Sequence, residues 1–121
     1  MKMKRDKELI KAILIFAEEH DGSPVIGPTN LPSLFHDVPL ENLIRHGQLM
    51  IDCGLIKGSS GRNGVTVTAI TWDGYEFLDN ARNTKVWNSA LKAAGGMSWG
   101  VFVNVLTTLA TDQAKSIIGG L

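Results

Sequence analysis

Side chains that can read the edges of DNA bases recur along one predicted helix, residues 37–54. Asn42, Arg45 and Gln48 carry amide or guanidinium groups, and His46 lies between them. Arginine pairs with two acceptors on guanine, and asparagine or glutamine pairs with two groups on adenine, so these residue types distinguish bases in the major groove. The pattern therefore predicts a helix whose exposed part contacts DNA.

Two further sets of residues have the chemistry of phosphate contacts. The stretch 59–64 is rich in glycine and serine and carries Arg62 and Asn63. Glycine lets backbone N–H groups approach an anion, and arginine adds a positive charge. Basic side chains also gather at the N-terminus, where Lys4 and Arg5 are candidates for contacts with the DNA backbone.

Acidic residues leave a second interpretation of these features open. Glu41 and Asp52 lie on the same predicted helix and would face DNA phosphates unfavourably, as in an ordinary solvated helix face. Arg62 could equally be incidental on a flexible surface turn. Twelve basic residues balance twelve acidic ones, so the chain as a whole has no net attraction to nucleic acid.

The elements that must position these residues follow from hydrophobic spacing and from helix-ending residues. Apolar residues at helical spacing predict a first helix over residues 6–20. Residues 25–38 contain two prolines, and only a short helical segment is expected there. Gly54 ends the next helix, and residues 55–71 predict a hairpin of two strands joined by the loop 59–64.

Three more helices are expected after the hairpin, capped by Thr71, Thr84 and Ser98. The order of helix, short helical segment, longer helix and hairpin is that of a winged helix-turn-helix. We therefore predict an α+β, mostly α fold. A winged helix-turn-helix domain (three helices plus a β-hairpin wing) occupies residues 1–82, and additional C-terminal helices occupy residues 83–121.

An apolar stripe on the last predicted helix indicates packing against another helix, through Trp99, Phe102, Leu106 and Leu109. The stripe fits either a homodimer or docking on the chain's own core. Residues 93–111 carry no charge, but their many glycine, asparagine and threonine residues are too polar for a membrane span, so no membrane contact is expected. Trp72, Trp87 and Trp99 are expected to pack the C-terminal helices against the winged domain rather than to stack on bases.

Residues suited to catalysis or metal binding are few and scattered. The single cysteine, Cys53, is predicted to be buried and inert, and the three histidines are too dispersed for a metal site. No nucleophile elbow, phosphate-binding loop or dinucleotide fingerprint is present, so neither a cofactor nor an enzymatic activity is expected. The charged N-terminus lacks the apolar run of a signal peptide, which predicts a cytoplasmic protein.

Several stretches of the sequence resemble known proteins. The segment "HGQLMIDCGLI" (46–56) resembles the end of the recognition helix of bacterial winged-helix regulators, and "AITWDGYEFLD" (69–79) resembles the segment after their wing. Three stretches together resemble a family of short phage, prophage and bacterial proteins of unknown function. They are "MKRDKELI" (3–10), the helix end "CGLI" (53–56) and "TWDGYEFLDNARNTKVWN" (71–88).

Two residues depart from these patterns. Gly47 replaces the leucine that commonly follows the histidine, and this glycine is expected to loosen the helix. Tyr75 stands where family members often have histidine, with no evident chemical consequence.

The resemblance implies a small winged-helix protein of phage or prophage type. We expect a cytoplasmic DNA-binding transcription regulator that acts as a dimer through its last helix. The alternative is a protein-interaction module on the same scaffold that binds a host or phage protein, including a defence protein, without binding DNA. Zero net charge and the acidic residues of helix 37–54 favour the alternative, whereas the basic N-terminus and Arg62 favour DNA.

Overall fold

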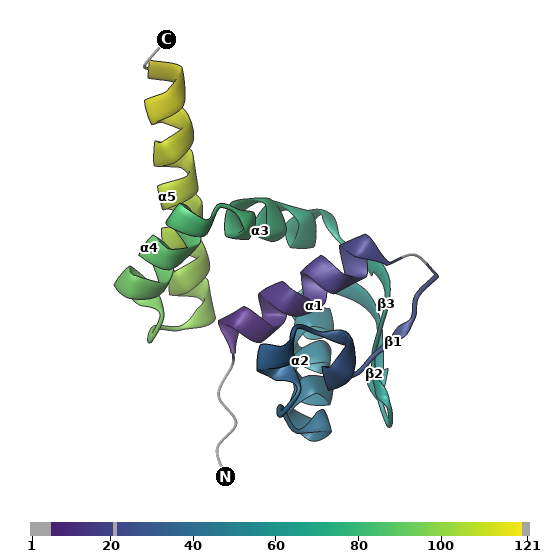
Figure 1. Cartoon of the computed structure of the whole chain (residues 1–121). Helices are drawn as coiled ribbons and strands as arrows, with labels where there is room; N and C mark the ends of the chain where they lie inside the picture. The colour runs from purple at the N-terminus through teal and green to yellow at the C-terminus, as the bar shows by residue number, and fades with distance from the viewer. Residues whose placement is uncertain (1–5, 21, 120–121) are drawn as a thin grey trace. The chain divides into compact units, whose positions relative to one another are not determined.

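The computed structural model describes residues 6–20 and 22–119, with side chains through residue 114 (Figure 1). The chain forms two compact units, Met1–Tyr75 and Glu76–Leu121. Within the described ranges the protein is α+β and mostly helical, with one antiparallel sheet of three strands. The elements are α1 (Lys7–Glu19), β1 (Val25–Ile26), η1 (Pro28–Asn30), η2 (Ser33–Phe35), α2 (Leu40–Asp52), β2 (Ile56–Gly61), β3 (Gly64–Ile70), α3 (Trp72–Arg82), α4 (Thr84–Ala94) and α5 (Trp99–Gly119).

The first helix forms as its spacing predicts. The Asp6 side chain caps α1 by accepting a hydrogen bond from the Leu9 N–H at 3.1 Å. Apolar residues at intervals of three and four lie on one buried side of the helix, namely Leu9, Ile10, Ile13 and Leu14. The prediction of a helix over residues 6–20 is therefore confirmed.

A short strand that the sequence analysis missed completes the sheet of the first unit. Val25 pairs with Thr66 and Ile26 pairs with Val65, so β1 lies beside β3 and the strand order is β1-β3-β2. Two residues are too few to show the alternation that identifies a strand. The rest of the predicted short helical segment consists of η1 and η2, each one turn of 3-10 helix.

The second long helix, α2, begins after Pro39 and ends as predicted at Gly54, which has the left-handed φ of +82°. α2 packs against α1, β2 and β3 (Figure 1). The prediction that Cys53 is buried is wrong. Cys53 is the C-cap residue, and because the chain leaves the helix there, its side chain is exposed.

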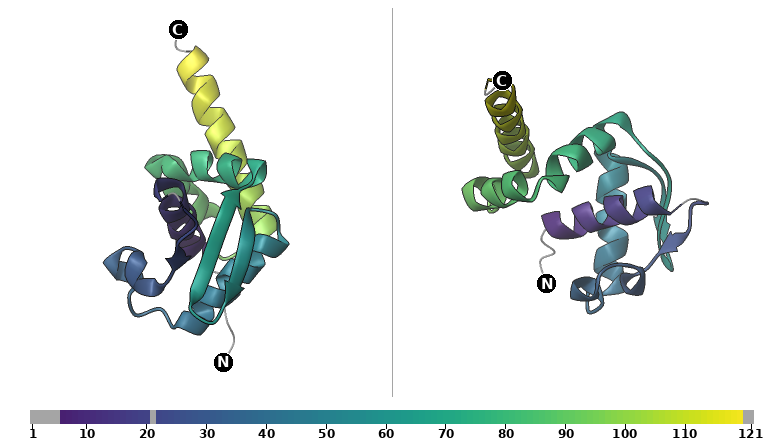
Figure 2. Two further views of the ribbon diagram at one scale, coloured as in Figure 1. Left: turned by 90° about the vertical axis from the view of Figure 1, so that its right-hand side faces the viewer. Right: turned by 45° about the horizontal axis from the view of Figure 1, so that its top comes forward.

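The hairpin extends further than the sequence suggests (Figure 2). Ser59, Ser60 and Gly61 belong to β2 and pair with Thr66, Val65 and Gly64, so the predicted loop over 59–64 is wrong. The turn that joins β2 to β3 contains only two residues, 62 and 63. Glycine-rich composition suggested a loop, but the Ser60 hydroxyl donates a hydrogen bond to the Ile44 carbonyl of α2 and holds the strand against that helix.

Helix α3 begins in the first unit and continues into the second. Thr71 caps it, as predicted, by accepting a hydrogen bond from the Gly74 N–H at 3.0 Å. The cap of α4 is Asn83, whose side chain accepts from the Val86 N–H at 3.1 Å, and Thr84 is the first residue of the helix. The Ser98 hydroxyl accepts from the Val101 N–H at 3.3 Å, which confirms the cap of α5.

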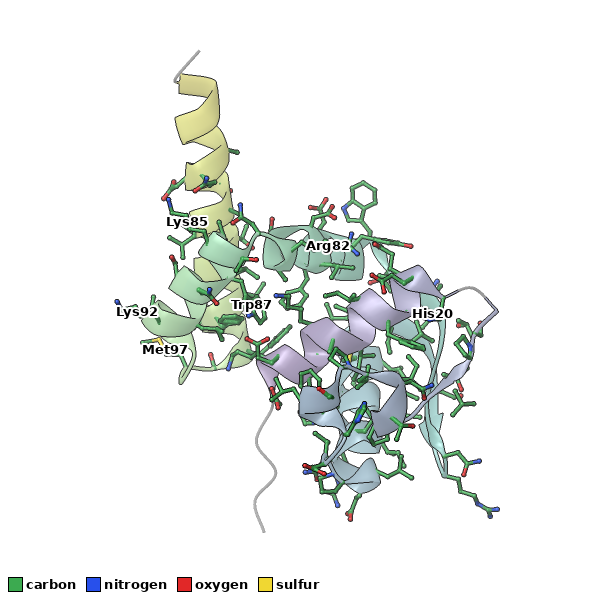
Figure 3. All side chains as sticks on the ribbon, in the orientation of Figure 1. His20, Arg82, Lys85, Trp87, Lys92 and Met97 are labelled. Atoms are coloured by element: carbon green, nitrogen blue, oxygen red, sulfur yellow. The ribbon has the colours of Figure 1, made fainter. Side chains whose placement is uncertain are left out.

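Aromatic side chains form the core of the second unit. Trp87 on α4 is 2% exposed and meets the rings of Phe77 and Phe102 edge-on, with ring centres 6.0 Å and 5.4 Å away (Figure 3). Lys92 on the same helix points away from this core (Figure 3). The packing role expected of Trp87 is confirmed, whereas the same role is wrong for Trp72, whose side chain is 78% exposed.

In the described part of the chain, no helix is both long enough and apolar enough to cross a membrane.

Candidate nucleic-acid interface

The inner side of α2 lies very close to the hairpin because residue 47 is glycine. A Cβ atom at this position would overlap Val65 Cγ2 and would lie 2.9 Å from Ser60 Oγ. The expectation that Gly47 loosens the helix is therefore incomplete, since its missing side chain lets α2 and β3 approach each other. This contact fixes the position of the outer side of α2 relative to the hairpin.

His46 lies on the inner side of α2 and not among the exposed candidates. Its side chain is 2% exposed, and Nε2 accepts a hydrogen bond from the Asp6 N–H at 2.8 Å. Nδ1 lies 2.7 Å from the Asn42 carbonyl, to which it donates when Nε2 is the acceptor. The prediction that His46 is exposed for base contact is wrong, because this side chain links α2 to the start of α1.

Replacing His46 by leucine should lower the free energy of unfolding by about 1–2 kcal/mol, because the Asp6 N–H loses its acceptor. Urea unfolding followed by circular dichroism measures this change. A matched control is His20→Leu, at an exposed histidine, where we expect a change within about 0.5 kcal/mol. Equal losses in the two variants would show that the His46 hydrogen bond contributes nothing specific.

Two of the remaining candidates are paired with carboxylates of their own helix. Arg45 Nη2 lies 3.1 Å from Glu41 Oε1, and Gln48 Nε2 donates to Asp52 Oδ1 at 2.8 Å. Both pairs span four residues, and such exposed pairs are worth only about 0.3–0.5 kcal/mol. The pairs can therefore open, but the carboxylates stay beside the groups that would contact DNA. Asn42 is half-buried at the same face.

The hairpin tip carries the exposed candidates Arg62 and Asn63. Next to them, Gly64 has φ +140°, and a Cβ atom there would overlap the Ile26 carbonyl oxygen. Glycine at this position therefore allows β1 to pack beside the tip and fix the base of the turn. Lys4 and Arg5, the other two candidates for phosphate contact, lie outside the described residues.

Comparison with known proteins identifies the family. A family model described as "Hypothetical protein (DUF2513)" matches residues 4–98. The chain belongs to this family. A protein of Haemophilus influenzae named "Uncharacterized protein" is 37% identical to the chain over 91 residues, which cover 72% of this chain and 75% of that protein. No solved structure matches the chain.

The DUF2513 match includes α2, the hairpin, α3 and α4, and it ends just before α5. All described candidates for DNA contact therefore lie within the family region, whereas the predicted dimerisation stripe lies beyond it. The resemblance to a family of unknown function is confirmed.

The first unit of this DUF2513 member is not strongly basic. Residues 1–75 contain nine acidic and eight basic side chains. The acidic residues are Asp6, Glu8, Glu18, Glu19, Asp21, Asp37, Glu41, Asp52 and Asp73, and the basic residues are Lys2, Lys4, Arg5, Lys7, Lys11, Arg45, Lys57 and Arg62. This near balance of charge gives little long-range attraction to a polyanion.

The predicted dimerisation stripe of α5 packs inside the second unit. Phe102 and Leu106 are both fully buried, and Trp99 contacts Phe77 and Phe102 with ring centres 5.1 Å and 6.2 Å away. Phe102 and Leu106 are therefore not accessible to a second copy, because the chain's own helices cover them, and the dimerisation set must be corrected for these two residues. Leu109 is half-buried.

Among the described residues no three His, Cys, Asp or Glu side chains gather into a group that could hold a metal ion.

Proposed function

We propose that this DUF2513 chain is a protein-interaction module on a winged-helix-type domain, rather than a sequence-specific DNA reader. Support for the winged helix comes from the element order, in which a helix, a short strand, helical turns, a longer helix and a hairpin follow one another. The strand order β1-β3-β2 and the packing of α2 on the hairpin are compatible with that fold. Phage or prophage origin is part of the proposal and rests on the resemblance of residues 71–88.

One observation carries the choice of a protein partner. Arg45 and Gln48, the exposed candidates for base contact on α2, each lie beside a carboxylate of the same helix. A duplex approaching this face would bring its phosphates toward Glu41 and Asp52, and the repulsion would oppose binding. A protein surface can instead present positive groups to these carboxylates.

The exposed hairpin tip favours a second candidate function, which is DNA binding as a transcription regulator. Arg62 and Asn63 are exposed at this tip, and in a winged helix the hairpin tip is the part that contacts the DNA backbone. If this candidate holds, a dimer would use accessible parts of α5, of which Trp99 and Leu109 are the incompletely buried members of the predicted stripe.

A DNA-shift assay separates the two candidates. The proposal expects no shift of a random-sequence duplex by the wild-type protein at ~50 mM salt, where phosphate contacts are strongest. The double variant Glu41→Gln/Asp52→Asn removes the two carboxylates of α2 and shows whether they suppress binding. Binding by the wild type that falls in both Arg45→Ala and Arg62→Ala would overturn the proposal and establish the DNA candidate.

A further inference from the structure

The outer side of α3 carries large aromatic and acidic side chains. Trp72, Tyr75, Glu76 and Asp79 follow the spacing i, i+3, i+4 and i+7, which places them on one side of this single helix. All four are exposed, with Trp72 at 78% and Tyr75 at 43%. On the opposite side, Gly74, Phe77, Leu78 and Ala81 are buried. The helix thus has one covered apolar side and one uncovered aromatic side.

The exposed side chains of Trp72 and Tyr75 suggest a binding role, because packing within the chain does not account for large aromatic groups at these positions. These two residue types dominate the binding energy of protein interfaces, since each buries a large rigid surface and keeps one polar group for a hydrogen bond. Trp72 is 78% exposed on a regular helix, so the described residues cover little of its side chain. The outer side of α3 therefore has the composition of an interface.

Charge limits the kind of partner that this side can accept. Glu76 and Asp79 are exposed on this side, Asp73 is exposed at its edge one position after Trp72, and Arg82 lies in the last turn of the helix (Figure 3). The three carboxylates outnumber the single Arg82 guanidinium, so this side keeps a negative charge that attracts cations and repels nucleic acid and acidic proteins. An arginine side chain satisfies both features, because its guanidinium plane stacks on an aromatic ring and its N–H groups pair with a carboxylate.

We infer that the outer side of α3, formed by Trp72, Asp73, Tyr75, Glu76 and Asp79, is a docking surface for an arginine-rich segment of a partner protein. The inference rests on the proposed function and names the surface and the partner's chemistry. Guanidinium groups of the segment stack on Trp72 and Tyr75 and pair with the neighbouring carboxylates.

Hydrogen bonds and one close backbone contact fix the start of α3. The Thr71 hydroxyl hydrogen-bonds with the Gly54 and Leu55 carbonyls and also accepts from the Gly74 N–H. A Cβ atom at Gly74 would overlap the Leu55 carbonyl oxygen, so only glycine permits this close approach. The backbone that carries Trp72 is therefore fixed before binding, which lowers the conformational entropy that binding would otherwise cost.

A peptide titration followed by NMR tests the inference. The probe is a short synthetic peptide of alternating arginine and glycine, added to the full chain labelled with nitrogen-15. The chain has three tryptophans, and the indole N–H signal of Trp72 is identified as the one missing in Trp72→Phe. We expect the Trp72 signal to move on titration and the signal of the buried Trp87 to stay in place.

The peptide affinities of matched variants show which side chains of α3 contribute to binding. We expect Trp72→Ala to weaken peptide binding at least about tenfold, as for a residue that carries interface energy. Trp72→Phe, which keeps an aromatic ring, should retain most of the affinity. Neutralising the α3 carboxylates in Asp73→Asn/Glu76→Gln/Asp79→Asn should also weaken binding, whereas neutralising three exposed carboxylates outside α2 and α3, in Glu19→Gln/Asp37→Asn/Asp112→Asn, should not. Unchanged indole signals of Trp87 and Trp99 confirm that each variant is folded.

Three results would overturn the inference. They are equal affinity in the wild type and Trp72→Ala, equal affinity of a peptide with lysine in place of arginine, and signal changes confined to α2 or the hairpin. Each of these results leaves the protein-interaction proposal standing, because that proposal is decided by the DNA-shift assay.

Discussion

Replacing Trp87 by alanine is expected to lower the free energy of unfolding of the second unit by about 3–5 kcal/mol. The side chain is 2% exposed and lies edge-on to Phe77 and Phe102. Alanine would leave a cavity between these rings, so the favourable transfer of the indole out of water and the ring contacts are both lost. Since whole domains are stable by only about 5–15 kcal/mol, this loss removes a large share of the unit's stability.

Urea unfolding monitored by near-ultraviolet circular dichroism measures the effect, because the ordered aromatic rings give that signal. Trp72→Ala is the matched control, since it makes the same chemical change at a side chain that is 78% exposed. We expect the control to change stability by no more than about 0.5 kcal/mol. Equal unfolding midpoints for the two variants would contradict the aromatic core described for the second unit.

The second large effect is expected at the contact between α2 and the hairpin. Gly47→Ala should lower the free energy of unfolding by about 2 kcal/mol, although alanine favours a helix over glycine by about 1 kcal/mol. The added Cβ would overlap Val65 Cγ2, and the branched valine side chain has few other rotamers to adopt. The free-energy cost of this steric overlap is therefore expected to exceed the gain in helix propensity from alanine.

Gly61→Ala provides the control for this prediction within the same hairpin. No atom lies within 4 Å of a Cβ built at Gly61, and its φ is not in the left-handed region. We expect the control to stay within about 0.5 kcal/mol of the wild type in urea unfolding. A stabilised Gly47→Ala variant would mean that α2 and β3 do not approach each other as closely as described.

Regular elements with their own caps were predictable from the sequence. α1 has four apolar residues at helical spacing and Asp6 at its start, and α2 ends at a glycine that adopts the left-handed conformation. These signals are local, so no knowledge of tertiary contacts is needed. The two-residue strand β1 gives no such signal, because its place in the sheet is set by pairing with β3.

The candidate site was predicted less well, because residue chemistry was given more weight than position. Leu43, His46, Gly47 and Met50 follow the spacing of one helix side, and all four are buried. Their spacing alone would have placed His46 inside, next to the glycine that contacts the hairpin. The pairing of Arg45 with Glu41 was predictable in principle, since the two residues are four positions apart.

The exposure of Trp72 could not be derived from composition. Tryptophan in an amphipathic segment is usually packed, and the segment that follows Thr71 does pack through Phe77 and Leu78. Trp72 is the first residue of α3, and the direction of its side chain depends on how Thr71 and Gly74 fix the start of that helix. The direction of the Trp72 side chain therefore depends on tertiary contacts, which the local sequence does not specify.

The two-residue connection at the end of the hairpin limits how the length of the chain can vary there. Gly61 pairs with Gly64, so the ladder continues to the last position before the turn. One residue added to each strand would lengthen the hairpin and keep every side chain on its present side. A single residue added within β3 beside Val65 would instead exchange the two sides of that strand, unless a bulge absorbed it, and would turn Val65 away from α2. Within the two strands, changes in length are therefore expected to be tolerated in pairs, whereas the turn itself can accept a single residue.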